Sequence, residues 1–264
     1  SISSKRRLIF WRTESKEEIK MSKINLEKGK IRISDRAFKQ DRQKAIRTLY
    51  EVIIEFVGNS AGSYNYQYKQ GKSKNPLGEV LIEYDRSKSK PFLRVYDSAE
   101  GMSYNKLKKS FTLYRESENL GDGRNFFGRG AKDATAIGDI RVETIHENKL
   151  SVIDLDMNGD WEMQKEKTAS KEERKKLKIH KKNGTVITLF IKEKKFQLPT
   201  VDSLRKYVPL HFAMNKYLHE GSPGGKVRLL EKGNIYDLIY RDPTESDVIV
   251  PEYNFEIKGY EGAK

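Results

Sequence analysis

The segment from residue 79 to residue 97 reads EVLIEYDRSKSKPFLRVYD and consists of two alternating runs around a polar turn. Alternation of apolar and polar residues is the pattern of a β-strand with one buried face. The alternating apolar positions are Val80, Ile82 and Tyr84 in the first run, and Leu93 and Val95 in the second. Residues 86–91 predict a hairpin turn between them. We therefore expect strands over 79–85 and 92–97, joined as a hairpin.

Other periodic segments flank this hairpin. Apolar residues at helical spacing predict a helix that is capped by Ser34 or Asp35 and ends near residues 58–62, followed by a loop over 64–76. Further helices are expected over 103–113, 131–138 and 201–218. Further strands are expected over 30–34, 140–146, 149–156, 185–192, 226–231 and 248–257. The chain therefore mixes helices and strands.

The composition excludes several classes of protein. The 264 residues contain no cysteine, which excludes disulfide scaffolds, Cys-ligated zinc, iron–sulfur clusters and thiol nucleophiles. The longest apolar runs have five or six residues, so we expect no membrane span and a soluble protein, cytoplasmic or, in a eukaryote, nuclear. Lys and Arg outnumber Asp and Glu by 52 − 38 = 14, which permits contact with nucleic acid without proving it.

Charge also divides the chain. Residues 1–36 carry eleven Lys and Arg against five Asp and Glu, and we expect a basic N-terminal arm there. Residues 37–195 are expected to form the core, with a charged insertion at about 159–183 that contains a solvated helix. Residues 196–264 contain a further helix and strands, which can complete the core and start a second domain.

The first motif with chemical meaning is Glu55 and Asn59, four residues apart on the expected helix. Residues at this spacing share one helix face. An amide oxygen suits Mg²⁺, and a carboxylate can take a proton from an attacking water. The same pair is also common as a polar stripe on half-buried helices.

The second motif is Asp97, Gly101 and Met102, directly after the second strand of the hairpin. A carboxylate at a strand end can accept a hydrogen bond from an exocyclic amine. Gly101 allows a sharp turn or a close approach to a flat ring, and Met102 offers an adaptable apolar surface. An ordinary turn that begins with Asp is the alternative.

The third motif is the glycine-rich run over 121–134, which leads into a helix that begins near Ala131. Gly128, Gly130 and Lys132 surround this expected N-terminus, where backbone amides and an ammonium group can bind phosphate. The run matches neither the P-loop nor the dinucleotide-binding pattern. A flexible glycine loop without a ligand is the alternative. Thr185, which follows a glycine at the start of a strand, is uninformative alone.

Taken together and in this order, the motifs resemble those of the GHKL superfamily of gyrase, heat-shock chaperone, histidine kinase and MutL ATPases, and within it the MORC-like ATPases most closely. The resemblance extends from about residue 45 to residue 192. It implies an α+β fold of Bergerat type, a two-layer α/β sandwich with helices on one face of a mixed, mostly antiparallel sheet. It also implies ATP and Mg²⁺ as cofactors, and a nucleotide-dependent homodimer.

The resemblance assigns a role to each motif residue. Glu55 would be the general base and Asn59 the magnesium ligand. Asp97 would bind the adenine amino group, with Gly101 and Met102 shaping the base pocket and Thr185 supporting it. Residues 104–127 would form a mobile lid. The phosphate-binding residues would be Gly128, Gly130, Ala131 and Lys132.

Departures from the family pattern affect the expected activity. Gly58 stands where the family often has an acidic residue, so we expect slow hydrolysis. We thus expect a slow, Mg-dependent ATPase that uses lid closure as a switch and can act on DNA. The alternatives are a nucleotide-gated scaffold without turnover and, less favoured, a histidine-kinase-like phosphotransferase. No histidine precedes His146, so a phosphoacceptor helix upstream is missing.

Overall fold

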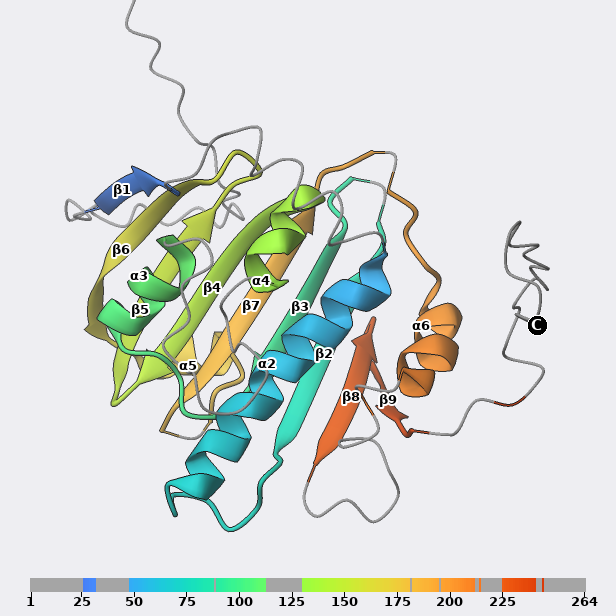
Figure 1. The fold of residues 1–264 in the computed structure, drawn as a ribbon, viewed down its shortest axis with the longest axis horizontal. Helices are drawn as coiled ribbons and strands as arrows, with labels where there is room; N and C mark the ends of the chain where they lie inside the picture. The colour runs from blue at the N-terminus through green and yellow to red at the C-terminus, as the bar shows by residue number, and fades with distance from the viewer. Residues whose placement is uncertain are drawn as a thin grey trace, which may run out of the picture.

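The computed structural model describes residues 26–31, 48–87, 89–112, 130–180, 182–194, 196–211, 214, 225–240 and 244. A nine-stranded sheet, in the order β1-β6-β5-β4-β7-β3-β2-β8-β9, forms its centre (Figure 1). All neighbouring strands are antiparallel except β2 and β8, which are parallel. The strands are β1 (Leu26–Lys30), β2 (Glu79–Asp85), β3 (Phe92–Asp97), β4 (Gly138–His146), β5 (Lys149–Leu155), β6 (Asp160–Thr168), β7 (Gly184–Ile191), β8 (Lys226–Glu231) and β9 (Asn234–Leu238). The expected α+β class and the mixed, mostly antiparallel sheet are confirmed.

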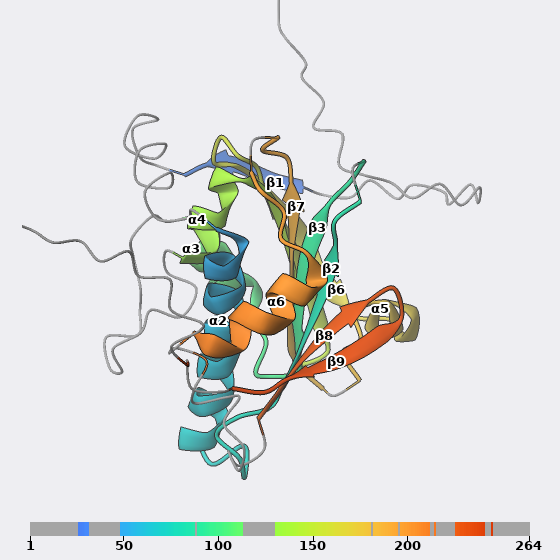
Figure 2. The same ribbon diagram turned by 90° about the vertical axis from the view of Figure 1, so that its right-hand side faces the viewer.

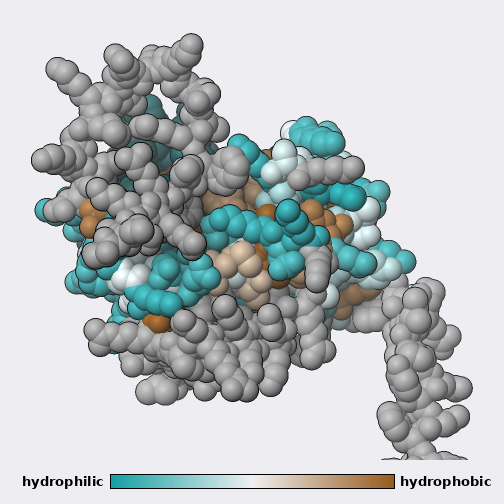
Figure 3. All heavy atoms as spheres, turned by 90° about the horizontal axis from the view of Figure 1, so that it is seen from above, coloured by the Kyte–Doolittle hydropathy of each residue, from teal (hydrophilic) through white to brown (hydrophobic). Residues whose placement is uncertain are grey.

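Helices cover mainly one face of this sheet. In Figure 2, α2 (Leu49–Lys69), α3 (Tyr104–Thr112) and α4 (Gly130–Asp133) lie on one side, and α5 (Lys171–Lys176) lies on the other. The remaining helical elements are the 3₁₀ turns η1 (Ala134–Ala136) and η2 (Val208–Leu210), and α6 (Val201–Tyr207). The position of α5 corrects the expectation that helices occupy one face only. The surface of the described residues mixes hydrophilic and apolar side chains when seen from above (Figure 3).

The main core lies between the sheet and α2. The helix contributes five fully buried apolar side chains, and they pack against the inward residues of the central strands: Leu49, Val52, Ile53, Phe56 and Val57. Thr48 begins the helix with a capping box, in which its hydroxyl accepts from the Glu51 amide and Glu51 accepts from the Thr48 amide. The caps expected at Ser34 and Asp35 lie outside the described residues.

Helix α2 continues past the expected end near residues 58–62. It passes through Gly58 and Gly62 and ends only at Lys69. Tyr64, in the segment expected to be a loop, is buried, and its hydroxyl donates to the Glu79 carbonyl at 2.8 Å. Tertiary packing on the sheet therefore overrides the weak helix propensity of the two glycines.

Strand β6 was not expected, because its residues lie in the range interpreted as a charged insertion. Only Trp161 and Met163 on this strand are buried, and they face the main core. Strand β6 also pairs with β1, which itself lies within the expected basic arm, displaced from the predicted strand over 30–34. Pairing between strands distant in sequence, and not local hydrophobicity, produces both strands. The strand expected over 248–257 lies outside the described residues.

Within the described residues, no helix is long and apolar enough to cross a membrane.

Candidate functional site

Glu55 and Asn59 lie on successive turns of α2, toward α4. Asn59 is almost fully buried, at 4% exposure. Burial raises the pKa of the Glu55 carboxyl, a hydrogen bond with the Asn59 side chain lowers it, and the nearby carboxylate of Asp133 raises it. Two carboxylates and an amide therefore converge between α2 and α4. We call Glu55, Asn59, Gly130 and Asp133 the helix cluster.

Gly130, the first residue of α4, makes room for the Glu55 carboxylate. A Cβ atom at this position would lie 1.9 Å from Glu55 Cδ and 2.1 Å from its Oε1. No side chain can occupy that space unless Glu55 moves. Gly130 and Ala131 thus bring backbone of the glycine-rich segment against the helix. Gly128 lies outside the described residues.

Lys132, expected to hold phosphate, has a partner within the protein. Its side chain is fully buried, and its Nζ donates to the carbonyl of Ser110 in α3 at 2.9 Å. A buried ammonium is costly unless polar groups surround it. In this structure the lysine therefore links α4 to the last turn of α3.

Asp97, at the end of β3, is the centre of a second cluster. Ser60 Oγ donates to Asp97 Oδ2 at 2.8 Å, and the Ala99 amide donates to Oδ1 at 3.0 Å. Burial raises the pKa of the Asp97 carboxyl to about 6, although these bonds and one from the Thr185 backbone lower it. The carboxylate is therefore fixed from both α2 and β7.

Two threonines continue this network on the same face of the sheet. The hydroxyls of Thr144 and Thr185 lie 3.1 Å apart, and Thr185 is the register partner of both Asp97 and Thr144. Thr144 Oγ1 accepts from the amide of Met102 at 2.9 Å. We call Ser60, Asp97, Thr144 and Thr185 the strand cluster.

Gly101 and Met102 connect this network to the core. Gly101 has φ +69°, and a Cβ there would lie 2.2 Å from the carbonyl oxygen of Ile145, so only glycine fits. The Met102 side chain is 2% exposed and belongs to the main core. Met102 therefore connects the strand cluster, which its amide contacts, to the main core, which contains its side chain.

The expected lid over 104–127 begins with a packed helix. Leu107 and Phe111 of α3 are fully buried in the main core. Lys108 pairs with Glu27 of β1, and Tyr104 donates to the same carboxylate at 2.8 Å. The first third of the predicted lid is thus anchored to the N-terminal strand. Residues 113–127 lie outside the described residues.

Sequence patterns missed Ser60, Asp133 and Thr144. The sequence did contain a signal for Thr144. It is a polar residue at the next position of the alternating series Ile140 and Val142, which faces the main core from β4. Ser60 directly follows Asn59, but its partner Asp97 is 37 residues away. That contact depends on how α2 crosses the sheet, which local patterns do not report.

A polar cavity of about 420 Å³ lies beside the strand cluster. Its wall includes Ser98 and Ala99, which directly follow Asp97, and its other residues come mainly from the end of α2 and the loop after it. None of the predicted site residues lines it. This cavity therefore adjoins the strand cluster through Ala99, but no member of either cluster is among its lining residues.

Among the described residues, no group of three or more His, Asp or Glu side chains is arranged to hold a metal ion. Comparisons with family models and with curated proteins find no match to this sequence. What the chain does is therefore inferred from the chemistry and geometry of its own residues.

Proposed function

We propose that this chain binds Mg·ATP and hydrolyses it slowly, as a GHKL-type ATPase with a Bergerat-type fold. The observation that carries the proposal is that α2 contributes residues to both clusters. Glu55 and Asn59 belong to the helix cluster, and Ser60 belongs to the strand cluster. Along the helix axis, Glu55 and Ser60 are separated by about 7.5 Å. One helix thus carries both a reactive carboxylate and the support of Asp97.

The strand cluster suits an adenine amino group. An ionised carboxylate offers about four acceptor positions. Donors from Ser60, Ala99 and Thr185 use three of them on Asp97, which leaves about one for a further N–H. A buried carboxylate that is already held in place can bind such a donor with little loss of side-chain freedom.

The helix cluster suits Mg²⁺ with phosphates. Carboxylate and amide oxygens are hard ligands of the kind that Mg²⁺ prefers, and the ion usually takes only one or two protein ligands besides phosphate and water. Asn59 would hold the ion, and Asp133 adds negative charge nearby. Bound Mg²⁺ would neutralise charge on the phosphates.

Glu55 would take the proton from the attacking water. Burial raises its pKa, which makes the carboxylate a stronger proton acceptor. Because Gly130 has no side chain, it leaves the space that the Glu55 carboxylate occupies. Asn59, one turn away, fixes the orientation of the carboxylate through their hydrogen bond.

A nucleotide-gated scaffold without turnover is the second candidate. The observation in its favour is Lys132, which is fully buried and whose Nζ donates to the Ser110 carbonyl in this arrangement. Nucleotide binding would then depend on a shift of α3, and hydrolysis would be secondary.

The decisive experiment compares Glu55→Gln with Asn59→Ala. We expect Glu55→Gln to reduce phosphate release by about 10²–10⁴-fold while it retains Mg·ATP binding. Asn59→Ala should weaken Mg·ATP binding itself, because a metal ligand is lost. Wild-type turnover by Glu55→Gln would exclude Glu55 as the base. Nucleotide binding without any turnover by the wild type would favour the scaffold.

We also propose a nucleotide-dependent homodimer and contact with duplex DNA through basic residues. Residues 1–47 hold fifteen Lys and Arg against six Asp and Glu, so 15 − 6 = 9 of the 14 excess charges lie there. Affinity for DNA should fall steeply with salt through counterion release. Gel shifts at two salt concentrations, with and without nucleotide, would test this; absence of binding at low salt would reject DNA as a partner.

A further inference from the structure

A second, smaller core lies on the face of the sheet opposite to α2. Seven buried side chains form it: Tyr96, Ile145, Leu150, Val152, Leu177, Ile179 and Val186. Leu177 and Ile179 come from the segment that follows α5, and they hold this segment against the strands. We call this group the rear core.

The rear core lies directly behind the strand cluster. Tyr96 precedes Asp97 on β3, Ile145 follows Thr144 on β4, and Val186 follows Thr185 on β7. Neighbouring residues of a strand point to opposite faces. Three of the four residues of the strand cluster therefore each have a neighbour that is fixed in the rear core.

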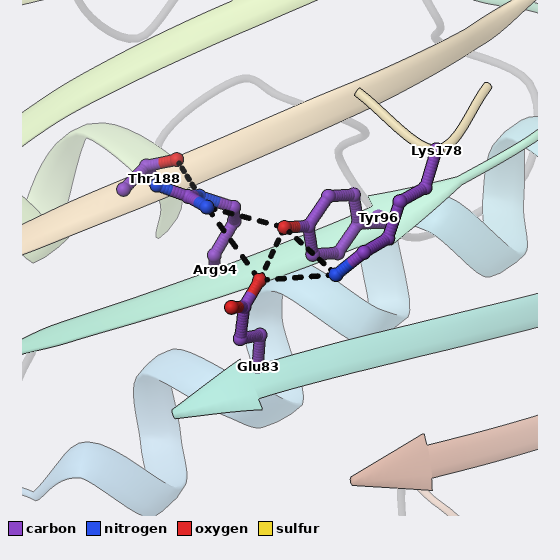
Figure 4. A network of polar contacts seen from close by, with 5 residues as sticks. All are labelled: Glu83, Arg94, Tyr96, Lys178 and Thr188. Carbon is purple, nitrogen blue, oxygen red and sulfur yellow. Dashed lines mark hydrogen bonds and ion pairs between the residues drawn. The ribbon is translucent and has the colours of Figure 1, made fainter. Parts of the chain in front are cut away.

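Lys178 is the polar contact from the α5 segment to this arrangement. Its Nζ lies 3.3 Å from Glu83 Oε2, 3.4 Å from the Tyr96 hydroxyl and 4.4 Å from the centre of the Tyr96 ring. Figure 4 shows the lysine and Arg94 approaching Glu83 and Tyr96 from opposite sides. Tyr96 in turn donates to the Glu83 carboxylate. The Tyr96 hydroxyl thus contacts Glu83, Arg94 and Lys178.

Ile179, the next residue, provides a second contact. A Cβ at Gly184 would lie 3.0 Å from Ile179 Cγ2 and 2.5 Å from the carbonyl oxygen of Asp97. The dipeptide of Lys178 and Ile179 therefore contacts β3 immediately before Asp97 and β7 immediately before Thr185. Lys178 has φ +53°, the left-handed conformation that ends α5, and the Ile179 amide donates back to the Arg174 carbonyl at 3.1 Å.

We propose that Lys178 is a positioning residue for Asp97, acting from the opposite face of the sheet through Tyr96 and Glu83. Tyr96 and Asp97 are consecutive on β3, so loss of the contacts that hold Tyr96 would let this part of the strand shift. That shift would displace the Asp97 carboxylate from its hydrogen bond with Ser60. The functional consequence of this inference depends on the proposed nucleotide site, whereas its structural part does not.

The test compares Lys178→Ala with Lys178→Arg, Lys176→Ala and Val152→Ala. Lys176 is exposed at the end of α5, two residues before Lys178, and is the control for loss of a positive charge. Val152 is a rear-core residue on β5 and is the control for general destabilisation. The measurements are the ¹³C signal of the Asp97 carboxyl without ligand, the affinity for a fluorescent ATP analogue, and the unfolding temperature.

We expect Lys178→Ala to shift the Asp97 signal and to weaken analogue binding by at most about fivefold, with a fall of no more than about 4 °C in unfolding temperature. Lys178→Arg should restore both properties. Val152→Ala should lower the unfolding temperature at least as much without moving the Asp97 signal. An unchanged Asp97 signal in Lys178→Ala, or an equal change in Val152→Ala, would overturn the proposal. If the wild type binds no analogue, the nucleotide site is wrong, but the Asp97 signal still decides the positioning role.

Discussion

The strand cluster and the helix cluster differ in what holds their carboxylates. Asp97 receives three hydrogen bonds, from Ser60 of α2, from Ala99 in the loop after β3 and from Thr185 of β7, and the rear core lies behind it. Glu55 has the Asn59 side chain as a partner and a second carboxylate, Asp133, nearby. Its position also depends on the missing side chain of Gly130.

This difference separates binding from chemistry. A carboxylate held by strand-end hydrogen bonds changes little when a ligand arrives, which suits recognition. The pKa of Glu55 is raised, as is that of Asp97, but the hydrogen bond of Glu55 with Asn59 leaves acceptor positions for the proton of a water, which suits catalysis. Changes at Glu55 and Gly130 should therefore reduce turnover, and changes in the strand cluster should reduce affinity and stability.

The largest effect is expected from Gly130→Ala. The new Cβ would collide with Glu55 Cδ, so the carboxylate must leave its seat, and turnover should fall by about 10²–10⁴-fold. Gly58→Ala is the matched control, because a Cβ at Gly58 meets nothing within 4 Å. That change should leave turnover intact and stabilise α2 by about 0.5–1 kcal/mol. Equal phosphate release by both variants would remove the contrast between the clusters.

Asp97→Asn should act on affinity. The Ser60 hydroxyl can rotate to accept from the new amide, so the fold should persist. The adenine amino group would then meet a donor in place of an acceptor, and affinity for an ATP analogue should fall about ten- to a hundredfold. Circular dichroism checks the fold, and fluorescence titration checks the affinity. Unchanged affinity would exclude Asp97 from base recognition.

Thr144→Val should reduce the free energy of unfolding by about 1–3 kcal/mol, because the buried amide of Met102 loses its acceptor. Thr185→Val is a milder change, since within the described residues the Thr185 hydroxyl pairs only with that of Thr144. Urea denaturation of both variants measures the difference. A larger loss for Thr185→Val would contradict the hydrogen-bond pattern assigned to the strand cluster.

Local patterns predicted the elements whose burial is regular along the chain. The strands over 79–85, 92–97 and 226–231 agree residue for residue with β2, β3 and β8. Strand β6 was missed because two buried residues, Trp161 and Met163, do not produce a clear alternation within a charged segment.

The candidate site shows the same contrast between contacts within one segment, which local patterns predict, and contacts between distant segments, which they do not. The spacing of Glu55 and Asn59 follows from helix geometry, so the sequence could bring them together. The contacts of Asp97 with Ser60, and of Lys178 with Tyr96, join segments 37 and 82 residues apart. They follow from the register of the sheet and the crossing of α2, which no single segment encodes.

The last expected effect is a pH dependence specific to the strand cluster. The folded-state pKa of Asp97 is raised to about 6 from its usual value of 3.8. Between these values the unfolded chain has released the proton and the folded chain retains it, so stability falls as pH rises through this window. Relative to Asp97→Asn, the wild type should lose stability of order 2 kcal/mol between pH 4 and pH 6, and the difference should be constant above pH 7.

Asp154, on the other face of the sheet, provides the control for this pH dependence of stability. Burial also raises its pKa to about 6, with Arg141 lowering it, so Asp154→Asn should remove a similar slope and leave that of Asp97 in place. Affinity for the ATP analogue should move in the opposite direction to stability, because an ionised Asp97 accepts the amino group better than a protonated one. Urea denaturation and analogue titration at pH 5, 6 and 7 measure the two trends. If affinity does not rise with pH in this window while stability falls, the Asp97 carboxylate is not the acceptor, and the strand cluster is a structural network only.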